Sequence, residues 1–137
     1  MQISPPTMTL AGIILITVPG IAFGGLTLLK FLMRGEPGYL DNPVRRGLWR
    51  AGHAHAGVLV LFSLVALLFV EASAMAEWLK WTVRVLIAAA PILMPLGFFL
   101  SVLRPGDTRP NRLIWLTKAG GASLALGTLT LGVGLLL

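Results

Sequence analysis

Four long apolar stretches, separated by short polar connections, account for nearly all of this chain. They cover residues 8–33, 48–70, 79–103 and 113–137. Each is long enough to cross the hydrocarbon core of a bilayer as an α-helix, which takes roughly 20 apolar residues. The pattern therefore predicts an all-α fold: a four-helix transmembrane bundle in which residues 1–137 form a single membrane domain.

The composition excludes a water-soluble domain. Hydrophobic residues make up 56% of the chain and charged residues 12%, which is about half the charged share of a typical soluble domain. The absence of cysteine rules out disulfides, cysteine-ligated zinc, iron–sulfur clusters and cysteine nucleophiles. The net charge of +6 would point to nucleic acid in a soluble protein. Here the charges cluster at the ends of the apolar stretches, so we expect the lipid bilayer, and no nucleic acid, as the partner.

The distribution of charge predicts the orientation. Two connections carry an excess of basic residues: Lys30, Arg34, Arg45, Arg46 and Arg50 around the first, and Arg104, Arg109, Arg112 and Lys118 around the third. Short connections rich in Lys and Arg stay on the cytoplasmic side. We therefore expect both termini outside (N-out/C-out), in a bacterial-type inner (cytoplasmic) membrane. Four tryptophans fall at span ends, where amphipathic rings are common: Trp49, Trp78, Trp81 and Trp115.

The two basic connections resemble each other. Each span before them ends in an arginine and a Pro/Gly turn, and each span after them begins with a proline, basic residues, a tryptophan and an Ala-Gly pair. One interpretation is a duplicated helical hairpin. The other is that any basic hairpin with a tryptophan anchor has this appearance. We also expect Asn42 to cap a helix that starts with Pro43, and the fourth helix to start in the same way around Pro110.

Small residues recur at intervals of three and four in three of the spans. In membranes, helices associate through close backbone approach at such positions. We expect tight helix packing, within one bundle or between copies, which favours a homo-oligomer or a larger membrane complex. The glycines expected at helix contacts are Gly20, Gly24, Gly52, Gly57, Gly120, Gly127 and Gly134.

Three prolines lie inside the predicted spans. Each removes a backbone donor and clashes with the carbonyl four residues earlier. We expect helix breaks or kinks at Pro19, Pro91 and Pro95. Transporters and channels use such breaks, and ordinary bundles use them to bend.

The two histidines of the chain lie together in Gly52-His53-Ala54-His55-Ala56-Gly57, near the start of the second span. Ionisable groups at membrane depth are functional candidates, and histidine binds metal or haem and transfers protons near neutral pH. Side chains at i and i+2 point about 200° apart on an α-helix, so both rings cannot bind one metal from a regular helix. We expect His55 to face inward and His53 to lie on another face, toward a headgroup or a neighbouring helix. A purely structural role, haem or metal binding, and proton handling all remain open.

Arginines near the span ends complete the set of candidates. We expect Arg45, Arg46, Arg50, Arg109 and Arg112 to reach lipid headgroups. Arg84 lies near the other end of the bundle, where it either pairs with Glu71 or Glu77 or reaches out to the interface unpaired.

Residues 50–58 and 108–116 resemble a family of small bacterial integral membrane proteins with four predicted spans. The resemblance implies the same four-span fold and brings no activity with it. A His-x-His at a helix start is also similar to haem-binding spans of haem–copper oxidase relatives, but those proteins carry many more histidines on other helices.

Three functions fit the sequence. The first is a non-catalytic membrane protein, either a small accessory subunit or a self-assembling bundle, because neither a hydrolytic set nor an acidic pair lies inside a span. The second is a redox or sensor protein that binds haem b or a transition metal through His55, with His53 in a separate role. The third is an oligomeric proton or small-ion pathway with His55 as the titrating group.

Overall fold

The structure is a computed structural model that describes residues 2–137. Every regular element in this part of the chain is a helix, and four long apolar helices pack together, as the sequence predicted. The elements are α1 (Pro5–Ile16), α2 (Val18–Arg34), α3 (Pro37–Leu40), α4 (Pro43–Ala72), α5 (Glu77–Leu100) and α6 (Ile114–Leu136). Since α1 and α2 together form the first span, the candidate spans are Pro5–Arg34, Pro43–Ala72, Glu77–Leu100 and Ile114–Leu136.

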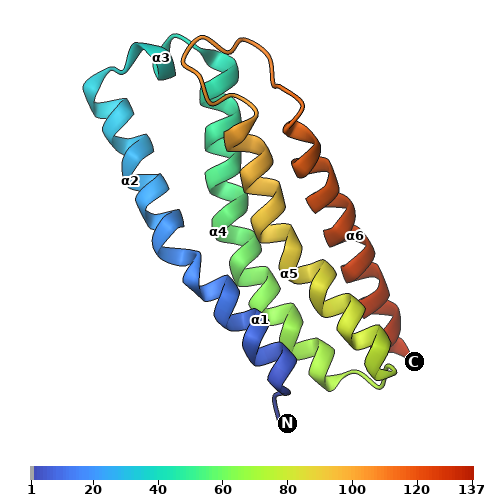
Figure 1. The fold of residues 1–137 in the computed structure, drawn as a ribbon. Coiled ribbons are helices and arrows are strands. Elements are labelled where there is room, and N and C mark those ends of the chain that lie inside the picture. Colours follow the sequence, from blue (N-terminus) through green and yellow to red (C-terminus); the bar gives the residue numbers. More distant parts are fainter. Residues whose placement is uncertain (1) are drawn as a thin grey trace.

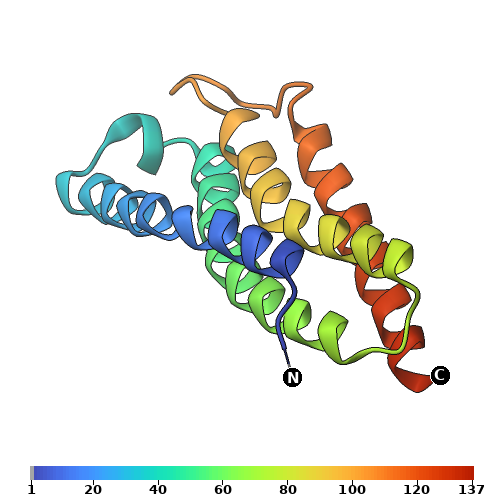
Figure 2. The ribbon, with the colours of Figure 1, turned by 60° about the horizontal axis from the view of Figure 1, so that its bottom comes forward.

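The helices α4 and α5 form the centre of the molecule (Figure 1). Helix α6 packs along α5 on one side, and the first span crosses α4 and α5 obliquely on the other (Figure 2). Both chain ends lie at one end of the bundle, called here the terminal end, together with the α4–α5 connection (Figure 1). Helix α3 and residues 101–113 lie at the opposite end, called here the loop end (Figure 1).

The first span is interrupted in its middle. Helix α1 ends at Ile16 and α2 begins at Val18, with Pro19 in the first turn of α2. The Thr17 hydroxyl donates to the Ile14 carbonyl at 2.7 Å, which keeps a polar group satisfied at the interruption. The interruption lies next to Pro19, and beyond it α2 diverges from the rest of the bundle (Figure 1).

Helix α5 continues through both of its prolines as one helix, so neither Pro91 nor Pro95 ends it, and a kink at either stays a prediction. Pro91 cannot donate to the Ile87 carbonyl four residues earlier. The hydroxyl of Ser63, from α4, donates to that carbonyl instead, at 3.1 Å. A neighbouring helix thus satisfies the backbone group that the proline leaves free, which is how membrane helices tolerate internal prolines.

Some of the helix ends lie where the sequence predicted them. Asn42 caps α4 by accepting a hydrogen bond from the amide of Arg45 at 3.0 Å, and Pro43 is the first residue of the helix, as predicted. Gly35 ends α2 with a φ of 66°, a conformation that glycine adopts without strain. The fourth span differs from the prediction: Asn111 accepts from the amide of Leu113 in a turn, and α6 begins only at Ile114.

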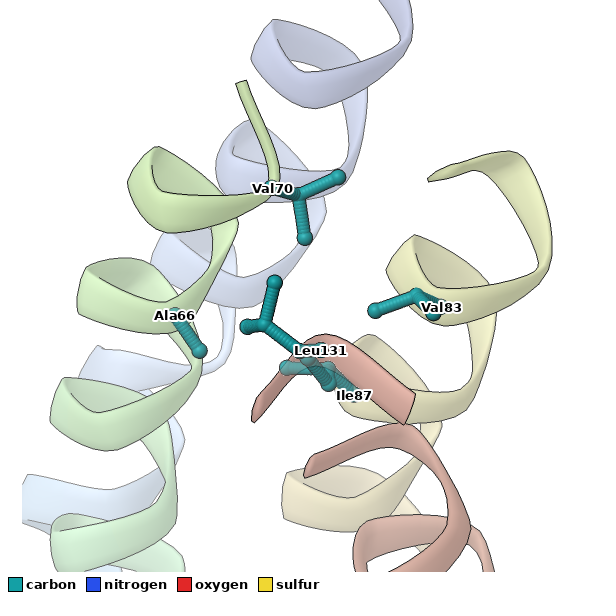
Figure 3. Close-up of a cluster of buried hydrophobic side chains, with 5 residues drawn as sticks. All are labelled: Ala66, Val70, Val83, Ile87 and Leu131. Carbon is teal, nitrogen blue, oxygen red and sulfur yellow. The ribbon is translucent and has the colours of Figure 1, made fainter. Parts of the chain in front are cut away.

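Two clusters of buried side chains form the core. One joins Ala66 and Val70 of α4, Val83 and Ile87 of α5, and Leu131 of α6 near the terminal end (Figure 3). The other joins α1 to the central pair through Ile14, Val60, Leu67 and Ala88. The first span therefore shares in the core through α1, whereas none of the described residues of α2 is buried.

Candidate functional site: a groove beside His53

The two histidines occupy different faces of α4. The ring of His53 lies against Gly24 and Gly25 of α2, so closely that a Cβ at Gly25 would come within 2.9 Å of it. The ring of His55 lies 5.1 Å from the Phe98 ring of α5, between centroids. The separation of the two rings agrees with the geometry of a regular helix.

His55 has a hydrogen-bond partner on its own helix. Its Nδ1 lies 2.7 Å from the Ala51 carbonyl, one turn earlier, which is a donating contact when Nδ1 carries the proton. His53 differs, because neither of its ring nitrogens has a hydrogen-bond partner among residues 2–137. The ring of His53 is half-buried, and neither nitrogen is fully enclosed. Of the two histidines, His53 is therefore the one with free hydrogen-bonding capacity.

A groove of about 230 Å³ lies beside the His53 ring. Its walls come from the first span, from α4 and from the proline-containing part of α5. Among the described helices, α2 packs against α1, α3 and α4 but not against α5, so the groove lies along the gap that the divergence of α2 leaves. The lining residues are Thr17, Gly20, Ile21, Gly24, His53, Ala56, Pro91, Ile92, Pro95, Leu96 and Phe99.

The groove is apolar apart from a few groups. Besides His53, its side-chain hydrogen-bonding group is the Thr17 hydroxyl, which is already bonded to Ile14. Pro95 removes the amide that would ordinarily bond to the Pro91 carbonyl. Among residues 2–137, no side chain donates to that carbonyl in place of the lost amide. The groove thus combines a long apolar wall with one imidazole that is free to donate or accept.

The sequence placed His55 inward and His53 toward a headgroup or a neighbouring helix. In the structure, His55 lies against α5 and His53 lies against α2, where it also lines the groove. The helical periodicity separated the two rings correctly. It could not identify the partner helix, because this depends on where α2 diverges after Thr17. The glycines of α2 were the available signal, since Gly24 lies directly against the ring of His53.

The predicted packing glycines divide into two groups. On α6, Gly120, Gly127 and Gly134 lie against α5 and the connection that precedes it, and Gly52 of α4 lies against Phe98 and Phe99. A Cβ at Gly20 or Gly57 would meet none of the described atoms within 4 Å. The sequence left packing within one bundle and packing between copies open for the stripe on α6, and these three glycines pack inside this chain.

A polar cluster at the terminal end holds α1 to the central helices. Arg84 is 1% exposed, and its guanidinium donates to a carboxylate oxygen of Glu71 at 2.8 Å and to the Thr7 hydroxyl at 2.9 Å. Thr7 and Ser4 also donate to the same carboxylate oxygen, and Glu77 lies 3.6 Å from Arg84. Of the alternatives that the sequence left open for Arg84, the paired one is present, and it pairs with both carboxylates.

Arg45 does not reach outward as expected. It is 6% exposed, and its guanidinium donates to the carbonyls of Gly38, Val102 and Leu103 at 2.8–3.3 Å. It also lies 3.9 Å above the centre of the Trp49 ring. Arg45 turns inward because it lies on the face of α4 that meets both connections at the loop end, where their backbone carbonyls accept from it.

The other four basic candidates are less buried. Arg46 is half-buried and donates to the Leu40 carbonyl at 3.0 Å, whereas Arg50, Arg109 and Arg112 are exposed. Three tryptophans are exposed near span ends, as expected, at Trp78, Trp81 and Trp115. Trp49 instead packs among Phe31, Tyr39 and Phe99.

Among residues 2–137, no three His, Asp or Glu side chains gather closely enough to hold a metal ion. In comparisons with known proteins, the chain matches no family model, no curated protein and no solved structure. The four-span fold that the sequence resemblance implied is present, and no family is identified.

Proposed function

We propose that this four-span membrane protein is a non-catalytic binding protein, an accessory bundle that holds a lipid-soluble molecule in the groove beside His53. The observation that carries the proposal is the free imidazole in an apolar groove. A half-buried ring with two unpartnered nitrogens keeps hydrogen-bonding capacity that a purely structural histidine would spend on the protein, as His55 does on Ala51.

The chemistry of the groove indicates the class of ligand. Small-molecule sites are mostly apolar, with a few polar groups that fix orientation. His53 supplies such a group, and the first span and α5 supply the apolar walls. The ligand that fits is neutral, has an apolar body, and carries a carbonyl or hydroxyl that pairs with the imidazole. A quinone with an isoprenoid tail has all three properties and is the probe of choice.

The test uses Trp49 as a reporter, because its ring packs on Phe99, which lines the groove, at 5.9 Å between centroids. The full chain with Trp78→Phe, Trp81→Phe and Trp115→Phe is placed in phosphatidylcholine vesicles, and an isoprenoid benzoquinone is added. We expect saturable quenching of the Trp49 fluorescence. His53→Ala should weaken binding roughly fivefold, the effect of one lost hydrogen bond.

His55→Ala is the matched control, since it removes the other histidine from the same helix turn but outside the groove. Its quenching curve should coincide with that of the parent protein. Quenching that rises linearly with quinone and is the same in both variants would show collision in the bilayer without a site. That result would refute the proposal for this ligand class.

Haem b is a second candidate for the same site. Haem iron takes a neutral imidazole as an axial ligand, and the free nitrogens of His53 offer one where the sequence had favoured His55. A protein that binds haem would show a Soret band that is lost in His53→Ala and kept in His55→Ala. A colourless protein after expression with added haem precursor would exclude this candidate and leave the quinone-type ligand standing.

A further inference from the structure

A second cavity, of about 390 Å³, lies at the loop end between α2, α3 and α4. It is separate from the groove beside His53 and shares none of the residues that line it. Three leucines of α2 form one wall: Leu28, Leu29 and Leu32. Leu29 and Leu32 are exposed on the outer side of the span, so this wall continues into the surface that faces lipid.

Two arginines of α4 form the opposite wall. Arg46 and Arg50 are one turn apart, so their side chains lie on the same face of the helix. Arg46 uses one nitrogen to donate to the Leu40 carbonyl at 3.0 Å, which fixes the side chain at the cavity. Within residues 2–137, no carboxylate lies within ion-pair distance of either arginine. Like charges at this spacing repel each other weakly, and an anion between them would relieve that repulsion.

Tyr39 of α3 supplies a third donor. Tyr39 is 4% exposed, because its ring packs on Phe31 and Trp49, and the residue lines the cavity. The Tyr39 hydroxyl has no hydrogen-bond partner in the described part of the chain, and it is not sealed inside the protein. The hydroxyl therefore keeps its hydrogen-bonding capacity for a group from outside the protein.

We propose that this cavity binds the phosphate of an anionic phospholipid between Arg46, Arg50 and Tyr39, with an acyl chain along the leucines of α2. Guanidinium groups recognise phosphate through charge-assisted hydrogen bonds, and a phenol adds a neutral donor. The apolar wall decides between two sources of phosphate. A free phosphate ion gains nothing from three leucines, whereas a lipid covers them with its own chain.

The test titrates the purified full chain in detergent with phosphatidylglycerol or phosphatidylcholine and counts bound lipids by native mass spectrometry. We expect one phosphatidylglycerol to be retained in preference to phosphatidylcholine. The double variant Arg46→Gln/Arg50→Gln should weaken that binding by roughly tenfold or more. Tyr39→Phe removes only the hydroxyl and should weaken it by roughly threefold. This second variant keeps the test decisive if the double variant does not fold.

The matched control is Arg109→Gln/Arg112→Gln, which removes the same charge from the same end of the molecule but from exposed positions that do not line this cavity. It should retain phosphatidylglycerol like the parent protein. An equal loss in this control would reduce the effect to general surface charge and overturn the proposal. Displacement of the lipid by millimolar sodium phosphate would also overturn it, because the site would then belong to a free anion.

Discussion

The first and the last span occupy the two edges of the molecule, and the same sequence signal has different results there. Both spans carry glycines and hydroxyl residues at intervals of three and four. Helix α6 uses this stripe against α5 along much of its length, with buried glycines at three positions, Gly120, Gly127 and Gly134. Helix α2 has no buried residue within the described range 18–34, and its glycines face the His53 ring or open space.

The two edges are also held by different interactions. On α6, the hydroxyls of Thr117 and Ser123 donate to carbonyls of α5, at 3.1 Å to Met94 and 2.7 Å to Leu86. The first span is held at α1 by the Arg84 cluster and by the fully buried Ile14. A stripe of small residues therefore marks a helix face that a neighbouring helix is able to approach closely. Whether a neighbouring helix does so depends on the contacts that hold the rest of the span in place.

The largest loss of stability should come from a substitution in the Arg84 cluster, which holds the first span to the central helices. Arg84→Met leaves the Glu71 carboxylate at the terminal end without its cation. Breaking a buried pair from one side typically costs about 3–5 kcal/mol, and we expect the free energy of unfolding to fall by about 3 kcal/mol. Unfolding by sodium dodecyl sulfate, followed by far-ultraviolet circular dichroism, measures it.

Lys80→Met is the control for that substitution, because it removes the same charge one turn away, where the partner Glu77 is exposed. It should cost less than about 1 kcal/mol. The double variant Arg84→Met/Glu71→Gln should recover part of the loss, since no uncompensated charge remains. If the double variant is as unstable as Arg84→Met, the pair does not anchor the first span.

The next largest loss of stability should come from the contact between the glycines of α6 and helix α5. A Cβ at Gly120 would lie 2.6 Å from the Cγ and 2.8 Å from the backbone nitrogen of Met94. Because backbone cannot give way, Gly120→Ala should lower the free energy of unfolding by about 2 kcal/mol, as overpacking does. Gly121→Ala, at the next position, meets no described atom within 4 Å and should be neutral or stabilising by up to about 1 kcal/mol. If both variants lost the same free energy of unfolding, the close contact between Gly120 and α5 would be contradicted.

The fold could be read from the sequence because the bilayer imposes it. Lipid allows only helices of sufficient length, so four apolar stretches predict four helices, and Asn42-Pro43 predicts where α4 starts. The effect of a proline was harder to predict. Pro19 coincides with an interruption, whereas α5 continues through Pro91, where the Ser63 hydroxyl replaces the lost amide, and through Pro95, where no side chain among residues 2–137 does.

The sequence predicted the helix turn that carries the candidate site, but not which of its two histidines lines the groove. The sequence identified the histidine pair and separated the two rings, but the choice between them depends on the path of α2. The placement of Arg45 failed for a similar reason, since its carbonyl partners lie at Gly38 and more than 50 positions later, at Val102 and Leu103. Local patterns do not encode such distant contacts, and the sequence offered no signal that Arg45 would turn inward.

The smallest effect should come from Gly25, and it gives the sharpest comparison of the two edges. A Cβ there would lie 2.9 Å from the His53 ring, nearly as close as the contact at Gly120. The neighbour is the end of a side chain beside a groove of about 230 Å³, so the ring is able to move aside. Gly25→Ala should therefore change the free energy of unfolding by less than about 0.5 kcal/mol, with the helix propensity of alanine offsetting the displacement. In a double-mutant cycle with His53→Ala, the coupling between the two positions should be similarly small. A loss as large as that of Gly120→Ala, relieved by His53→Ala, would show that the ring is held fixed and that the edge at α2 is as tightly packed as the edge at α6.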